Sequence, residues 1–140
     1  MTFYRSIEDL PDFKSYHMTN RTYKYFTGEP LFPFGHGLSY TNFSYSKLEV
    51  FDEVEKGKEI QVSVEVTNSG KVNGDEVIQL YISKETKVEG DPKHVLVGFK
   101  RINLNPGQVE KVKFKITPKQ YAFFTKDGQK NVIPESIQVF

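Results

Sequence analysis

The chain has 140 residues, of which 26% are charged, and its formal net charge at pH 7 is +1 with no cysteine. This length suits one domain with a core of ordinary size and is too short for a two-domain hydrolase. The balanced charge gives no reason to expect a nucleic acid or a membrane as partner, and the lack of cysteine excludes disulfides and thiol chemistry.

Residues 1 to about 20 have no regular apolar period and are expected to form a loop with at most one short turn. Ser6 can cap such a turn because an acidic side chain, Asp9, follows three residues later. Pro11 then ends the turn, since proline interrupts a helix.

Residues 21–45, RTYKYFTGEPLFPFGHGLSYTNFSY, are the most informative stretch. Twelve of the twenty Phe and Tyr residues lie at or before Tyr45, with neither a helical nor a clean strand period. Proline and glycine punctuate the stretch, so an irregular, extended backbone is expected. Each ring hides roughly 150–250 Å² from water when buried, so a segment this aromatic needs a surface to lie on. The interrupting residues are Gly28, Pro30, Pro33, Gly35 and Gly37.

From Phe43 the pattern changes to the two-residue alternation of strands. Residues 58–68 form the clearest strand, in which one face is apolar and the other polar. An earlier strand needs a bulge at residues 46–47, because two apolar pairs, both expected to be buried, are out of phase there. These pairs are Phe43 with Tyr45 and Leu48 with Val50. The inward side chains of the clearest strand are Ile60, Val62, Val64 and Val66, and the outward ones are Gln61, Ser63, Glu65 and Thr67.

Further strands are predicted towards the C-terminus. The connection at residues 68–74 contains Gly70 and Gly74, and glycines can take positive φ in such a connection. Residues 95–104 form one or two short strands, and residues 105–107 (Asn-Pro-Gly) match a type II turn. The inward side chains of two strands are Ile78, Leu80 and Ile82, and then Val112, Phe114 and Ile116, the latter set opposite a solvated row of Lys111, Lys113 and Lys115.

The last hairpin turn is predicted at Asp127 and Gly128, between strands around residues 121–124 and 136–140. The strands together predict an all-β fold, a seven-stranded immunoglobulin-like antiparallel sandwich over residues 41–140. Residues 1–40 form an irregular N-terminal arm ahead of it.

Several blocks of the chain resemble one protein family. They are residues 21–26 (RTYKYF), 28–40 (GEPLFPFGHGLSY), 66–70 (VTNSG), 74–81 (GDEVIQLY), 98–101 (GFKR) and 104–107 (LNPG). Their order and spacing are similar to those of the C-terminal fibronectin type III-like domain of family 3 glycoside hydrolases, which include β-glucosidases and β-xylosidases. Residues 2–16 are most similar to the β-xylosidase branch. The resemblance covers nearly the whole chain and implies a fibronectin type III-like sandwich.

The resemblance also implies an accessory domain without catalytic residues. In the family the two catalytic carboxyl groups belong to a barrel domain and an α/β domain that precede the matching segment, and neither motif occurs here. The acidic pairs of this chain, Asp52/Glu53, Asp75/Glu76 and Glu89/Asp91, are expected to be solvated. His17, His36 and His94 have no metal-ligand spacing, so neither a metal nor a cofactor is expected.

The arm is the predicted recognition surface, which binds the catalytic domains of the parent chain or, without them, folds back or self-associates. His36 stands where the family usually has an aromatic residue, and an interface role is expected for it. The predicted interface residues are Arg21, Tyr23, Tyr25, Phe26, Leu31, Phe32, Phe34, His36, Leu38 and Tyr40.

Two other functions stay open. An independent carbohydrate-binding or adhesion module would contact polysaccharide through exposed rings, for which Tyr121, Phe123 and Phe124 are the candidates. A free-standing enzyme would need a convergent polar cleft, of which the sequence shows no sign. A chain that starts within the family-like pattern is expected to be a fragment, and a parent that acts on plant polysaccharide would be secreted or periplasmic.

Overall fold

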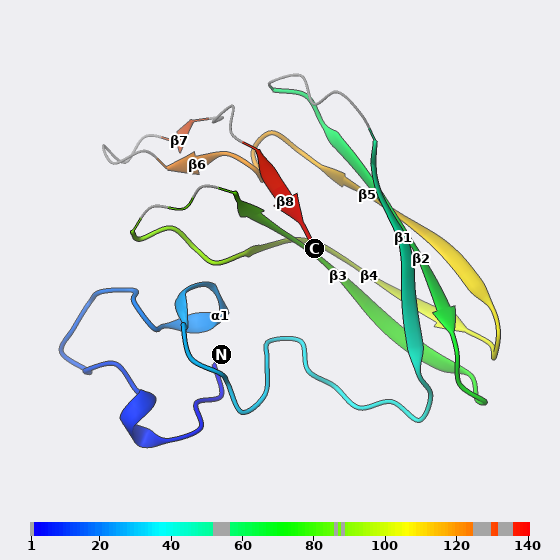
Figure 1. The fold of residues 1–140 in the computed structure, drawn as a ribbon, viewed down its shortest axis with the longest axis horizontal. Helices are drawn as coiled ribbons and strands as arrows, with labels where there is room; N and C mark the ends of the chain where they lie inside the picture. The colour runs from blue at the N-terminus through cyan, green and yellow to red at the C-terminus, as the bar shows by residue number, and fades with distance from the viewer. Residues whose placement is uncertain (1, 52–56, 86, 88, 125–129, 132–135) are drawn as a thin grey trace. The chain divides into compact units, whose positions relative to one another are not determined.

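The computed structural model describes residues 2–51, 57–85, 87, 89–124, 130–131 and 136–140. Figure 1 shows its elements, a 3-10 turn η1 (Ile7–Asp9), one α-helical turn α1 (Thr22–Tyr25) and several strands. The strands are β1 (Phe43–Phe51), β2 (Ile60–Asn68), β3 (Gly74–Lys84), β4 (Val95–Leu104), β5 (Val109–Ile116), β6 (Phe123–Phe124), β7 (Lys130–Asn131) and β8 (Ile137–Val139). The all-β prediction is confirmed. Among the described residues, no helix has the length and apolar character needed to cross a membrane.

The strands form two antiparallel three-stranded sheets and one short hairpin. The first sheet has the order β1-β2-β5 and the second β4-β3-β8, while β6 pairs with β7 (Figure 1). The predicted final hairpin is therefore wrong in its partner, because β8 pairs with β3, with Ile82 opposite Val139. Among the described residues, six strands form the two larger sheets and two form the hairpin, where one sandwich of seven strands was expected. The turn at residues 127–128 lies outside the described residues.

The sandwich core follows from the alternation of β2. Ile60, Val62, Val64 and Val66 are all buried, and Val64 lies opposite Val112 of β5. The apolar side chains of β2 and β5 pack against those of β3 and β4, so the core joins both sheets. Its buried members are Val64, Val66, Ile78, Ile102, Leu104 and Val112, with Phe43 and Phe114 packed against them. The predicted lysine row of β5 is exposed.

Strand β1 confirms one prediction and corrects another. Its pairing with β2 shifts register between Ser46 and Glu49, and Lys47 has φ 49°, which is the expected bulge. However, Tyr45, Leu48 and Val50 are each about half exposed, so their predicted burial is wrong. The reason is position, because β1 is an edge strand with a neighbour on one side only.

The glycines divide into two physical classes. Gly107 has φ 75° and the Gln108 N–H donates to the Asn105 carbonyl at 3.0 Å, which confirms the type II turn. Gly70 and Gly74 do not use the positive φ that was open to them. A Cβ on Gly70 would lie 2.1 Å from Thr41 Oγ1 and one on Gly74 would lie 2.6 Å from Thr41 Cγ2, so these glycines permit close packing.

Thr41 is held by a buried side chain that the sequence analysis did not single out, Asn68. The Asn68 amide group donates to the carbonyls of Val72 at 2.8 Å and Leu104 at 2.9 Å. Its oxygen accepts from the Thr41 hydroxyl at 2.7 Å and from the Gly70 N–H at 3.0 Å. Asn68 thereby joins the segment before β1, the loop after β2 and the end of β4.

Contacts between residues divide the chain into two compact units. The first unit contains Met1–Gly37, Tyr81–Val95 and Ser136–Phe140, and the second contains Leu38–Leu80 and Leu96–Glu135. The second unit holds the sandwich core and Asn68. The domain boundary at residues 40/41 remains a prediction.

Candidate docking surface

The early part of the arm is braced within the first unit. The Arg21 guanidinium donates to the carbonyl oxygens of Asp12, Ser15 and His17 at 3.0, 2.8 and 3.0 Å. The Ser6 N–H donates to Asp9 Oδ2 at 3.1 Å and caps the short turn η1 as predicted. Arg21 thus fixes the loop in front of α1, and its own hydrogen bonds point inward along the chain.

Phe26, directly after α1, is buried in the first unit at 7% exposure. Its ring meets the Tyr4 ring edge-on, with centroids 5.1 Å apart. A Cβ on Gly28 would lie 2.7 Å from Phe26 Cζ, so glycine is required for this ring to fit. The sequence analysis expected an irregular backbone here and no helical turn. The turn can form because the prolines and glycines that interrupt a helix begin only after Phe26.

Lys93 ties the arm to the connection between β3 and β4. Its N–H donates to the Lys24 carbonyl at 2.7 Å and its Nζ to the Phe26 carbonyl at 2.9 Å. The Ser83 hydroxyl donates to the Lys93 carbonyl at 2.7 Å. The arm is therefore anchored on both sides of Tyr25, the last residue of α1.

Tyr23 stands at the centre of a ring cluster in the first unit. It stacks on Phe34, with centroids 4.6 Å apart, and lies 6.0 Å from Tyr81 and 5.7 Å from His94. Burial, followed by the charges of Lys93 and Lys87, lowers the pKa of His94, which favours the neutral imidazole at pH 7. The cluster holds Phe34 in place from one side.

The second half of the arm presents apolar side chains to solvent. We call Leu31, Phe32, Phe34, Leu38 and Tyr40 the exposed arm segment, in which Leu38 is 95% exposed and Tyr40 is fully exposed. The backbone here is fixed, since the Leu31 N–H donates to the Phe3 carbonyl at 2.7 Å.

A tight turn also holds this segment. The His36 N–H donates to the Pro33 carbonyl at 3.0 Å, and Gly35 has φ 84°. The His36 ring lies 4.9 Å from the Phe32 ring, so His36 serves as a stacking partner. The rings of Phe32 and Phe34 are therefore displayed by a hydrogen-bonded backbone.

The ten predicted interface residues thus separate into two groups. Arg21, Tyr23, Tyr25 and Phe26 are partly or fully buried, whereas Leu31 through Tyr40 are exposed. Two further rings, Phe13 and Tyr16, are 98% and 100% exposed and were not among the predicted interface residues. Only their aromatic character within a polar loop could have marked them.

Three residues of the acidic pairs, Asp75, Glu76 and Asp91, have partners within the chain. The hydrogen bond from Arg101, with help from Asn103, holds the pKa of Asp75 below its usual range, so Asp75 is a carboxylate. Tyr45 donates to Glu76 at 2.6 Å, and Asp91 pairs with the buried Lys84 at 3.1 Å. Asp52 and Glu53 lie outside the described residues.

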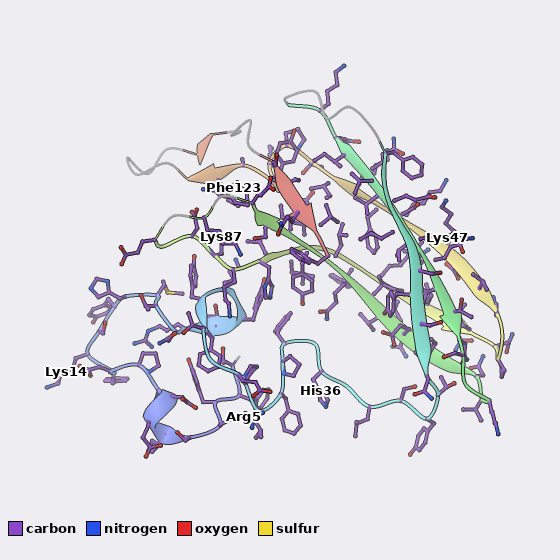
Figure 2. The ribbon with its side chains drawn as sticks, viewed as in Figure 1. Arg5, Lys14, His36, Lys47, Lys87 and Phe123 are labelled. Atoms are coloured by element: carbon purple, nitrogen blue, oxygen red, sulfur yellow. The ribbon has the colours of Figure 1, made fainter. Side chains whose placement is uncertain are left out.

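Two other candidate sites can be placed. Within the described ranges, no three acidic, histidine or cysteine side chains form a group that could hold a metal ion. Tyr121, a candidate for an exposed sugar-stacking ring, is instead buried at 4% exposure, and its hydroxyl donates to the Lys58 carbonyl at 2.8 Å. Phe123, labelled in Figure 2, is partly buried, and the side chain of Phe124 is outside the described part.

Comparison with known proteins agrees with this geometry. The family model of the fibronectin type III-like domain matches residues 76–139, which run from β3 to β8. Proteins similar over most of the chain are β-xylosidases and β-glucosidases. The chain belongs to the fibronectin type III-like domains of family 3 glycoside hydrolases. The predicted resemblance is confirmed.

This chain spans only a small part of the length of the relatives that it matches. It is 42% identical over 88% of its length to a β-xylosidase of Formosa agariphila, of which it spans 17%. It is 38% identical over 95% of its length to a xylan 1,4-β-xylosidase of Xylanibacter ruminicola, of which it spans 15%.

Solved structures give the same proportion. A β-glucosidase of Erythrobacter marinus matches with TM-score 0.79 and 33% identity, over 99% of this chain and 19% of the other. A β-glucosidase of Listeria innocua matches with TM-score 0.73 and 30% identity, over 80% of this chain and 16% of the other.

Proposed function

We propose that this domain is a non-catalytic accessory part of a β-glycosidase and docks through the exposed arm segment onto the catalytic domains. Those domains would hydrolyse terminal β-linked glucose or xylose residues. The observation that carries the proposal is the exposure of five apolar side chains between Leu31 and Tyr40, on a chain that spans only 15–17% of two similar glycosidases.

The exposure of these side chains supports an interface. Within the first unit Leu31, Phe32 and Phe34 are 53%, 44% and 42% exposed, and within the second unit Leu38 and Tyr40 are almost wholly exposed. Exposed apolar side chains that gather on a protein surface commonly mark interaction sites. An ordered backbone lowers the entropy cost of docking, because the side chains need not be arranged at the moment of contact.

The docking test uses a hybrid enzyme. The matching segment of the Xylanibacter ruminicola xylosidase is replaced by this domain, with or without Leu38→Ser and Tyr40→Ser. Because both side chains are exposed, the isolated domain should lose no more than about 0.5 kcal/mol. The hybrid should lose about 1–3 kcal/mol of interface energy and should inactivate at a lower temperature.

A double variant on β5, Lys113→Ser with Lys115→Ser, is the matched control, since it removes two exposed side chains away from the arm. Equal thermal inactivation of the two hybrids would contradict docking through the exposed arm segment. Deletion of the whole arm is a poorer test, because it also removes Tyr23 and Phe26 from the packing of the first unit.

The isolated domain is expected to release no nitrophenol from aryl β-glucosides or β-xylosides. A retaining glycosidase needs a nucleophile and an acid roughly 5–5.5 Å apart across a sugar site. Asp75 and Glu76 are instead engaged by Arg101 and Tyr45. Nitrophenol release that scales with the amount of purified domain would contradict this expectation. If the release persisted in a variant that carries Asp75→Asn and Glu76→Gln, the catalytic site would lie elsewhere in the domain.

A further inference from the structure

A pocket of about 350 Å³ lies in the first unit, lined by Tyr81, Lys87, Lys93, His94 and Phe140. This volume falls in the range of about 300–1,000 Å³ that is typical of small-molecule sites. Neither the docking proposal nor the sandwich core makes use of it.

Aromatic side chains form one wall of the pocket. Tyr81 and Phe140 are directly opposite, because each N–H donates to the other's carbonyl at 2.9 Å, so their side chains emerge on the same face. The His94 ring meets the Tyr81 ring edge-on, with centroids 5.2 Å apart. The Tyr23 ring packs against both, at 6.0 Å from Tyr81 and 5.7 Å from His94. A flat ligand would meet surfaces that are already in position.

Two ammonium groups form the rest of the lining. Lys93 Nζ is held by one hydrogen bond to the Phe26 carbonyl, and an ammonium group has three donors, so two remain for a ligand. Figure 2 shows Lys87 on the connection between β3 and β4. Both lysines line the pocket, and their charges help to lower the pKa of His94. The five lining residues include no acidic side chain.

We infer that this pocket binds a small carboxylate carried on a six-membered ring. The carboxylate meets Lys87 and Lys93, while the ring lies against Tyr81 and Phe140. A carboxylate would accept charge-assisted hydrogen bonds from the two ammonium groups, and a neutral ring would form only weaker ones. A uronic acid and an aromatic carboxylic acid share this chemistry. The inference does not depend on the docking proposal.

The test is a titration of the isolated domain, followed by amide NMR shifts, with glucuronate, benzoate and glucose as separate probes. Glucuronate or benzoate should shift the signals of Lys87, Lys93 and His94, and glucose should not. A stronger response to glucuronate identifies a sugar acid as the natural class, and a stronger response to benzoate an aromatic acid. No response to either acid, or an equal response to glucose, overturns the inference.

Charge-removing variants sharpen the result. Lys87→Gln should weaken binding of the acid about tenfold, which corresponds to about 1.4 kcal/mol. Lys14→Gln, at an exposed lysine of the same unit that does not line the pocket, should leave binding unchanged. The bound acid should also raise the pKa of His94, because its charge offsets the two lysines. Equal weakening by both variants would contradict the inference.

Discussion

Replacing Asn68 by alanine should lower the free energy of unfolding by about 3–5 kcal/mol, since each buried polar group left unpaired costs about 1–3 kcal/mol. The substitution removes four hydrogen bonds at once. The carbonyls of Val72 and Leu104 and the Thr41 hydroxyl lose their hydrogen-bond partner. Asn68 itself is 0% exposed, so water cannot replace this partner without opening the structure. Chemical denaturation followed by circular dichroism measures the loss.

Asn73→Ala is the matched control for this experiment. Asn73 lies in the loop that follows Asn68, and its side chain donates to Asn103 and Asn105. It is exposed, so water can replace these hydrogen bonds. Its cost should stay below about 1 kcal/mol. If both variants unfold at the same denaturant concentration, Asn68 does not have the structural role assigned to it.

Replacing Val64 by aspartate should abolish folding. Val64 is 8% exposed and packs in the cluster that joins the two sheets, opposite Val112. An unpaired carboxyl group there costs several kcal/mol, a large part of a typical stability of about 5–15 kcal/mol. Calorimetry and near-ultraviolet circular dichroism should show no cooperative transition.

Gln61→Asp separates burial from strand propensity. Gln61 is in the same strand but exposed, and its neighbours in register are Phe51 and Lys115. Aspartate is a poor strand former, so a cost of up to about 1 kcal/mol is expected at this position. A Val64→Asp variant that melts like Gln61→Asp would refute the assignment of the two faces of β2.

The structure changes how the arm is best understood. Tyr23 and Phe26 pack within a unit that also contains Tyr81–Val95, and Lys93 bonds to both sides of residue 25. Every residue from Leu31 to Tyr40 is by contrast exposed. Within the first unit, Tyr23 stacks on Phe34 and the Phe3 carbonyl accepts from the Leu31 N–H, so the early part of the arm supports the segment around these residues.

The sequence by itself determined the alternating strands β2, β3 and β5, the bulge of β1 and the turn at Gly107, because each depends on side chains a few residues apart. The family blocks determined the fold class and the relation to glycosidases for the same reason, since they are local motifs. Only the tertiary structure decided the partners of β6 and β8, the half-exposed face of β1, and the role of Gly70 and Gly74 beside Thr41. Asn68 belongs with these, because its partners are up to 36 residues away and no local pattern contains them. Strand order, edge position and buried hydrogen bonds depend on which distant segments meet, so a local apolar period cannot specify them.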